Sequence, residues 1–408
     1  MKIAMLHWGF PPVIGGVETH LAMLCPDLVR MGHDVSLLTG WVDERREEVR
    51  VNGVLVRRTP LMDLNWLNPA RILAFKAEIA AEVRDFILDV RPDVIHAHNM
   101  HYFSPTHAEV LGAVKREFGI PLVLTAHNVW SDSLWEEMLA YKDQWDEIIA
   151  VSAYIKRELV LSGYPAERIK VIYHGIDVDK FSPAREADED LFREMPALRG
   201  RRIIFHPARM SLAKGSHLAV QAMAEIATEF PDALLVMAGT EKTVDWGSYQ
   251  QGEIATIRKM IEDLRLTERV AIRFLPWSEM PRMYRASEIV IYPSCFEEPF
   301  GLVMLEALAS GRPLVVSRAG GMPEIVKNGL NGLVIPRGSA DALAGACLLL
   351  LRNREYALKL ANRGRERVMK YFTKEVMAKK TVAAYARVIS LAKAAESRTI
   401  QAGHRPAS

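Results

Sequence analysis

The sequence has few cysteines and no long apolar segment, and both shortages exclude whole classes of protein. Its 408 residues include only three cysteines, widely spaced and without a metal-ligand pattern, which disfavours a disulfide scaffold or a cysteine metal site. The uncharged apolar run at 342–351 is too short to cross a bilayer. The first residues lack the apolar region of a signal peptide. We therefore expect a cytoplasmic protein with buried, reduced thiols.

Two common nucleotide-binding motifs are also missing. A dinucleotide-binding fold places Gly-x-Gly-x-x-Gly after its first strand, whereas this chain has His-Trp-Gly-Phe-Pro-Pro at residues 7–12. The P-loop pattern Gly-x4-Gly-Lys-Ser/Thr is absent as well. Nicotinamide dehydrogenases and P-loop kinases are therefore disfavoured.

The formal net charge is only +2, but the charge is unevenly distributed. Residues 1–198 carry a net charge of −9, whereas residues 352–408 carry +10. We interpret the basic stripe near the C-terminus as a solvated helix face. The alternative is weak association with an anionic surface, which would place the protein at the inner face of the membrane. No aromatic-studded basic motif accompanies the stripe, so nucleic acid is not an expected partner.

Short apolar runs alternate with helical patterns along nearly the whole chain. This alternation predicts an α/β fold with two doubly wound, Rossmann-like domains that face each other across a cleft. Periodicity is lost at 181–200, so we expect domains at 1–180 and 181–373. The expected strands are 3–7, 35–39, 94–98, 122–127 and 148–151 in the first domain, and 203–206, 234–238, 271–274, 289–292, 314–317 and 332–335 in the second.

Hydrogen-bonding side chains and flexible glycines follow several strands of the first domain. The carboxyl ends of parallel strands form the edge at which open sheets bind ligands. We expect a site for a polyhydroxylated ligand there, whereas His96, inside its strand, is expected to be structural. The expected site residues are Gly15, Gly16, His98, His127 and Asn128.

The segment at 292–326 has the clearest chemical pattern in the chain (YPSCFEEPFGLVMLEALASGRPLVVSRAGGMPEIV). A strand ends, a loop carries Glu298, and a helix begins near Phe300–Leu302. The unpaired N–H groups and the dipole of a helix start can bind an anion. Glu306 lies within the helix, so both carboxylates flank the anion site and can accept hydrogen bonds from sugar hydroxyls.

Arg209 and Lys214 follow another strand of the second domain. They can reach the same edge and neutralise phosphate oxygens, which the two carboxylates would otherwise repel. The simpler interpretation is a pair of solvated loop charges. Their position after a strand, with Gly215 adjoining Lys214, favours the site.

These residues resemble a known family. The Glu298-x7-Glu306 segment is similar to the signature of the retaining family 4 glycosyltransferases, which have the GT-B fold. Arg209 and Lys214-Gly215 match the Arg-x4-Lys-Gly element of that family. Gly15-Gly16, preceded by two prolines, resembles its N-terminal glycine loop. The resemblance covers almost the full chain.

The resemblance implies a role for each domain. The second would hold a nucleotide-diphosphate sugar, with UDP or GDP as the expected nucleotide, and the first would hold a hydroxyl acceptor. Arg209, Lys214, Glu298 and His127 would be catalytic. Glu306 would contact the ribose, and Glu298 and His127 would contact the transferred sugar. The backbone N–H groups of Phe300, Gly301 and Leu302 would contact phosphate or sugar. Arg209 and Lys214 would bind the leaving diphosphate, Gly16 would lie near it, and the backbone near Phe274 and Leu275 would contact the base.

The resemblance also implies the remaining features of the enzyme. No metal or other cofactor is expected. A last helix at about 374–396 would cross back to the first domain. Apart from the resemblance, residues 397–408 are expected to be disordered because they form the end of the chain. The acceptor could be a sugar, a sugar phosphate, a small glycoside or a lipid-linked sugar. The alternatives are a nucleotide-sugar epimerase, a phosphorylase or a non-catalytic scaffold on the same fold.

Overall fold

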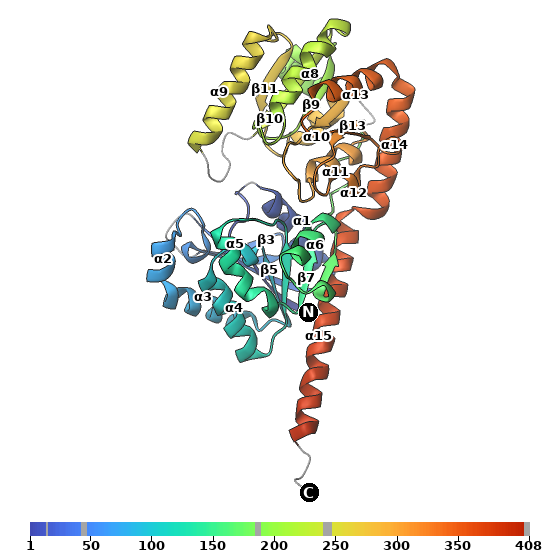
Figure 1. The fold of residues 1–408 in the computed structure, drawn as a ribbon. Coiled ribbons are helices and arrows are strands. Elements are labelled where there is room, and N and C mark those ends of the chain that lie inside the picture. Colours follow the sequence, from blue (N-terminus) through green and yellow to red (C-terminus); the bar gives the residue numbers. More distant parts are fainter. Residues whose placement is uncertain (14, 42–46, 184–188, 240–246, 404–408) are drawn as a thin grey trace. The chain divides into compact units, whose positions relative to one another are not determined.

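The computed structural model describes residues 1–13, 15–41, 47–183, 189–239 and 247–403, and it divides into two compact units (Figure 1). The first unit comprises residues 1–173 and 374–408, and the second comprises residues 174–373. The units therefore meet in sequence between Tyr173 and His174, before the predicted boundary at residue 180. The reason is packing, because the His174 ring lies 5.0 Å from the Phe300 ring within the second unit.

Eight strands form the sheet of the first unit, in the order β3-β4-β2-β1-β5-β6-β7-β8. All neighbours are parallel except β3 and β4, which are antiparallel. The sequence pattern predicts five of these strands and misses β3, β4 and β8. The bounds are β1 (Lys2–Leu6), β2 (Asp34–Gly40), β3 (Glu47–Val51), β4 (Val54–Thr59), β5 (Val94–His98), β6 (Leu122–Ala126), β7 (Glu147–Ala150) and β8 (Ile169–Val171).

Helices cover both faces of this sheet because its strands bury side chains on both sides. In β1, Ile3 and Met5 face a core that includes Leu24 and Tyr385, which come from the first and the last helix of the chain. The α-helices of the unit are α1 (Gly16–Arg30), α2 (Pro69–Ala74), α3 (Lys76–Val90), α4 (Pro105–Phe118), α5 (Ser133–Met138), α6 (Ala153–Leu161) and α15 (Lys374–Gly403). Short 3-10 helices are η1 (Pro60–Met62), η2 (Met100–Tyr102), η3 (Leu139–Gln144) and η4 (Ala166–Arg168).

Six parallel strands form the sheet of the second unit, in the order β11-β10-β9-β12-β13-β14. The sequence pattern predicts all six. In β9, Ile204 packs into the core under α8, and Phe205 points to the opposite face and contacts Tyr284. The bounds are β9 (Arg202–His206), β10 (Ala233–Gly239), β11 (Val270–Phe274), β12 (Ile289–Tyr292), β13 (Leu314–Ser317) and β14 (Leu333–Ile335).

The helices of the second unit follow its strands in alternation, which is the doubly wound pattern. Helix α11 begins at the segment with the two predicted glutamates. The bounds are α7 (Glu189–Glu194), η5 (Pro196–Leu198), α8 (Ser216–Glu229), α9 (Gly247–Asp263), α10 (Met280–Ala286), α11 (Leu302–Ala309), α12 (Met322–Ile325), α13 (Ala340–Arg352) and α14 (Arg354–Tyr371).

The last helix, α15, belongs to the first unit and packs against α1. It runs to Gly403, so the predicted disorder is wrong for residues 397–403, where neither proline nor glycine interrupts the helix before its last residue. Residues 404–408 lie outside the described part of the chain. Among the described helices, none combines the length and the apolar character that a membrane span requires.

The three thiols differ in burial. Cys25 and Cys347 are buried, as predicted, and burial raises the pKa of each to about 12. Cys295 is partly exposed because it lies in the loop after β12, so the prediction of buried thiols is wrong there.

Candidate active site

A lysine and a glutamate are in contact at the carboxyl edge of the second sheet. Lys214 Nζ lies 2.5 Å from Glu298 Oε1, and the Glu298 side chain is buried. The Ser294 hydroxyl lies 3.0 Å from the same carboxylate oxygen. Because Lys214 follows β9 and Glu298 follows β12, its neighbour in the sheet, the parallel strand order brings these two predicted residues together.

The loops that carry Lys214 and Glu298 are joined to each other by backbone contacts. The Cys295 N–H donates to the Ala213 carbonyl over 2.8 Å. Gly215 has φ +75, and a Cβ there would lie 2.0 Å from the Pro293 carbonyl oxygen. Only glycine combines this φ with so close an approach. The result is a rigid support for the lysine–glutamate contact.

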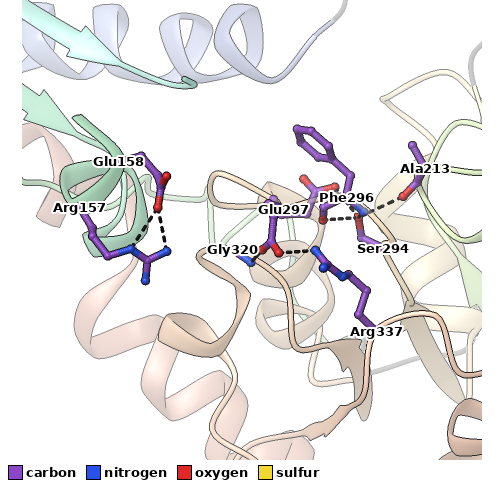
Figure 2. Close-up of polar contacts among 9 residues, drawn as sticks. Arg157, Glu158, Ala213, Ser294, Phe296, Glu297, Gly320 and Arg337 are labelled. Carbon is purple, nitrogen blue, oxygen red and sulfur yellow. Dashed lines mark hydrogen bonds and ion pairs between the residues drawn. The ribbon is translucent and has the colours of Figure 1, made fainter. Parts of the chain in front are cut away.

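The loop after β13 closes against the Glu298 backbone from the other side. Gly320 has φ +51, and a Cβ there would lie 2.1 Å from the Glu298 carbonyl oxygen. The Gly321 N–H donates to that oxygen over 2.7 Å. The adjacent Glu297 accepts from the Gly320 N–H and pairs with Arg337, as Figure 2 shows. The two neighbouring glutamates therefore differ, since Glu297 holds the loop and Glu298 contacts Lys214.

Tyr292 lies at the end of β12, close to the charged groups of this edge. Burial raises the pKa of Tyr292 well above its usual range, and Glu298 raises it further. The Arg209 charge lowers the same pKa. Arg209 itself is exposed, and within the described residues it forms no ion pair. The positive charge of Arg209 can therefore pair with a bound anion.

Glu306 lies in a second polar group, formed by residues that are distant in sequence. The Tyr284 hydroxyl donates to Glu306 Oε2 over 2.6 Å, and Trp277 also hydrogen bonds to the carboxylate. Burial raises the pKa of Glu306, and Lys180 opposes that shift. The Lys180 ammonium lies 3.0 Å from the centre of the Trp277 ring. Glu306 is thus a buried carboxylate in a fixed orientation.

The start of α11 lies between these two groups. Gly301 is the residue before the helix and has φ +90, so the chain turns there to leave the first N–H groups of the helix without helical partners. Phe300 is buried and anchors the turn. Leu302 is the first residue of α11. Leu275, predicted near the base, is buried after β11, whereas the Phe274 side chain lies outside the described part of the chain.

The first unit presents histidines at the equivalent edge of its own sheet. His98 Nδ1 lies 3.0 Å from His127 Nε2, so these two predicted residues are in contact. His20 from α1 packs against both rings. His7 contacts Glu18 through Nε2 over 3.1 Å and the His98 carbonyl through Nδ1. Burial lowers the pKa of His98 well below its usual range, and the surrounding histidines lower it further.

The remaining predicted residues of the first unit surround this histidine group. Gly15 adjoins the Glu18 carboxylate, because a Cβ there would lie 2.2 Å from Oε2, whereas a Cβ on Gly16 would meet nothing within 4 Å. The Asn128 side chain accepts from the next backbone N–H, and its carbonyl contacts His101. His96 is structural, as predicted, since its ring nitrogens contact the Tyr385 and Thr125 hydroxyls.

Sequence reasoning missed several residues that hold the site. Their signals are weak, because each is an isolated polar residue whose neighbours only the fold brings close. Glu18 is not among them, because it belongs to the segment that resembles the N-terminal glycine loop of the family, two residues after Gly16. The missed residues are His20, Lys180, Trp277, Tyr284, Tyr292 and Ser294.

Comparison with known proteins decides the family. The model for glycosyl transferases group 1 matches residues 188–367, and the model for glycosyltransferase family 4 matches residues 14–180. An uncharacterised glycosyltransferase of Methanocaldococcus jannaschii is 30% identical over 408 aligned residues, which cover 94% of this chain and 98% of that protein. This chain is a group 1 glycosyltransferase of the family 4 type. The predicted family is confirmed.

Other relatives of this group 1 glycosyltransferase are named for different activities. Glycogen synthase of Mycobacterium tuberculosis is 29% identical, with 94% of each chain covered. D-inositol 3-phosphate glycosyltransferase of Corynebacterium glutamicum is 27% identical, with 88% of this chain and 90% of that protein covered.

Solved structures share the fold. HepE of Anabaena, crystallised with UDP and glucose, has a TM-score of 0.77 at 20% identity and covers 95% of this chain and 99% of its own. Sucrose-phosphate synthase of Thermosynechococcus elongatus has a TM-score of 0.79 at 21% identity with the same coverage. The predicted fold of two Rossmann-like domains is therefore confirmed.

Proposed function

We propose that this glycosyltransferase transfers a sugar from a nucleotide-diphosphate sugar to a hydroxyl acceptor, with retention of anomeric configuration and without a metal ion. One observation carries the donor half of the proposal. Lys214 contacts Glu298 at the edge where Arg209 has no carboxylate partner among the described residues, beside the start of α11. A diphosphate fits such a set of cations and N–H groups.

The donor is a UDP- or GDP-sugar, and the complexes of HepE with UDP support UDP as the first choice. Glu306 accepts hydrogen bonds from the ribose hydroxyls in this proposal. Its buried, fixed carboxylate supports that role, since Tyr284 already orders one of its oxygens. Glu298 binds hydroxyls of the transferred sugar. Phe300, Gly301 and Leu302 donate backbone hydrogen bonds to phosphate or sugar, and the base lies near Phe274 and Leu275.

The proposed step breaks the bond between the anomeric carbon and the terminal phosphate oxygen, and forms a bond from that carbon to the acceptor oxygen. The leaving nucleoside diphosphate keeps the electron pair. The acceptor hydroxyl loses its proton to the departing phosphate on the same face of the sugar. Arg209 and Lys214 stabilise the charge that develops on the diphosphate, which is the largest contribution positioned groups make to such a reaction.

In this proposal the first unit binds the acceptor, and His127 contacts the reacting sugar. The contact between His98 and His127 supports this role, because it fixes the orientation of the His127 ring. Asn128 adds an amide next to it. Gly15 precedes α1 and Gly16 begins it, and in this proposal they allow the backbone to approach the diphosphate.

Product analysis tests the proposal. The enzyme is incubated with UDP-glucose, GDP-mannose or ADP-glucose, a mixture of neutral and phosphorylated sugar acceptors, and EDTA. We expect release of one nucleoside diphosphate together with a glycoside whose anomeric configuration, read by NMR, matches that of the donor. An altered nucleotide sugar without acceptor consumption would identify an epimerase instead. Dependence on inorganic phosphate would identify a phosphorylase.

A further inference from the structure

An aromatic cluster lies next to the histidines of the first unit, at the carboxyl edge of its sheet. Tyr102 follows β5 and Trp130 follows β6, the next strand in the sheet. Their rings are stacked, with centroids 3.9 Å apart and planes 5° apart. Trp135 from α5 packs against both rings, with centroids 6.5 and 6.2 Å away. We call Tyr102, Trp130 and Trp135 the aromatic shelf.

One ring of the aromatic shelf is buried, and the other two are partly exposed to solvent. Trp135 is buried and packs against the buried His101, whereas Tyr102 and Trp130 are only half-buried. The Tyr102 hydroxyl donates to the Asp132 carboxylate, and Asp132 also accepts from the Trp135 N–H at the start of α5. The two outer rings therefore keep their orientation while part of their surface stays in contact with solvent.

The two segments that form the shelf carry charge of one sign only. The segments that form it, residues 99–104 and 127–138, contain Asp132, Glu136 and Glu137 but neither lysine nor arginine. All three carboxylates are exposed. His101 does not offset them, because burial lowers its pKa to about 4 and leaves it neutral at pH 7. A phosphate group would be repelled here, whereas a neutral ring with hydroxyls would not.

We propose that the aromatic shelf binds the acceptor, and that the acceptor is a neutral saccharide rather than a sugar phosphate or a lipid-linked phosphate. The apolar face of a pyranose ring packs on the face of Trp130 that Tyr102 does not cover, and the carboxylate of Asp132 accepts hydrogen bonds from the sugar hydroxyls. The location supports this assignment, because His127 and Asn128, proposed for the reacting sugar, begin the same loop as Trp130. The assignment rests on the proposed function for its role in transfer.

Direct binding tests the shelf without any donor. Methyl glucoside, methyl mannoside and maltose are titrated while tryptophan fluorescence is recorded, with glucose 6-phosphate as the charged counterpart. We expect at least one neutral probe to change the fluorescence of the wild type, no change with Trp130→Ala, and a weaker response to glucose 6-phosphate. A wild type that responds to none of the neutral probes, or best to the phosphate, overturns the proposal.

Steady-state kinetics show whether the aromatic shelf affects acceptor binding and leaves donor binding unchanged. Trp130→Ala is expected to raise the acceptor KM about tenfold, the effect of losing one well-packed apolar contact, with the donor Kd unchanged. Tyr102→Phe keeps the ring and should retain most of the affinity. Phe118→Ala, a half-buried aromatic at the end of α4 that contacts Arg84, is the matched control and should leave the acceptor KM unchanged. Acceptor KM values equal to wild type in Trp130→Ala refute the shelf.

Failure of the shelf and failure of the proposed function give different results. If a neutral saccharide binds but no nucleotide sugar is turned over, the transfer reaction is wrong and the shelf stands as a saccharide site. If transfer occurs and Trp130→Ala behaves as wild type, the shelf is wrong and the transfer reaction stands.

Discussion

The two units have the same parallel α/β architecture but build their ligand-binding edges from different chemistry. The edge of the second unit contains charged groups, with Lys214 on Glu298 and Arg209 beside them. The edge of the first unit contains buried histidines, and burial keeps the pKa of His98 well below its usual range. One edge suits an anion, and the other offers neutral hydrogen-bonding groups and aromatic rings.

This difference shows how one fold can divide a transfer reaction between two substrates. Strand order fixes where the side chains gather, since the carboxyl ends of parallel strands always share an edge. The residue types at those ends then decide which ligand is favoured. In the proposed function, the edge with Lys214 and Arg209 binds the charged leaving group, and the edge with the histidines binds the hydroxyl acceptor.

The largest predicted effect comes from removing a cation from the charged edge. Lys214→Ala should lower kcat/KM for transfer by about 10³-fold, because a positioned group that stabilises developing negative charge contributes about this much. The variant should stay folded, since Ser294 still contacts Glu298. Lys259→Ala, which removes an exposed lysine paired with Asp263 on α9, is the matched control and should retain wild-type kinetics. Steady-state kinetics at saturating acceptor measure both, and equal rates for the two variants would disprove the cation's role.

The next effect tests whether the charged edge depends on close backbone packing. Gly320→Ala should reduce the free energy of unfolding by about 2–4 kcal/mol, because its Cβ would collide with the Glu298 carbonyl as well as strain the backbone. Gly338→Ala shares the positive φ but meets nothing within 4 Å, so it should cost only about 1 kcal/mol. Urea unfolding of both variants gives the difference. If both substitutions cost the same, the proposed packing against Glu298 is wrong.

Acid should affect the neutral edge more than the charged one. Burial lowers the pKa of His96 to about 3 and those of His101 and His107 to about 4, and it lowers the pKa of His98 as well. These rings stay neutral when folded but bind protons when unfolded, so their stability contribution is lost as pH falls below about 6.5.

The second unit has fewer such histidines among its described residues: burial lowers the pKa of His174 to about 3 and that of His206 to about 4, and it also lowers the pKa of His217. Limited proteolysis at about pH 7 and about pH 5, with mass-spectrometric assignment of the first cuts, compares the units. We expect the first cuts at low pH to fall in the first unit. First cuts confined to the second unit would contradict the comparison.

The smallest predicted effect concerns Glu306. Burial raises the pKa of Glu306, so the folded state binds this proton more tightly than the unfolded state, and the associated stability is lost as pH rises through the folded pKa. Glu306→Gln has no carboxyl group to ionise. The Tm of the variant minus the Tm of the wild type should therefore increase by about 2–4 °C as the pH is raised from about 5 to about 8. Glu366→Gln, at an exposed position on α14, is the control and should show no such gain. A Tm difference that does not change with pH would show that burial does not raise the pKa of Glu306.

Much of the fold could be predicted because alternation of apolar strands and amphipathic helices is a local signal. The strands that were missed are those without it. In β3 and β4, charged residues such as Glu48 and Arg57 alternate with valines, and their pairing across the hairpin is visible only in three dimensions. The unit boundary was misplaced because His174 packs on Phe300, a contact between residues far apart in the chain.

The candidate site could be predicted where its residues share one segment and not where tertiary contacts assemble it. Glu298, Gly301 and Glu306 stand within one loop and helix, so their spacing revealed them. Tyr284 and Lys180 reach Glu306 from other elements, and no sequence spacing relates them. Likewise, Tyr102 and Trp130 are stacked only because β5 and β6 are neighbours in the sheet.

Thermal unfolding with nucleotides tests the central claim most directly. Wild type and Lys214→Ala are heated with UDP, GDP or ADP and the matching nucleotide sugars, without added metal. We predict that one nucleotide raises the Tm of the wild type by about 5 °C or more at a hundredfold excess over Kd, and that the shift is largely lost in Lys214→Ala. No shift with any nucleotide at millimolar concentration, or an equal shift in both proteins, would contradict the assignment of the charged edge to the donor.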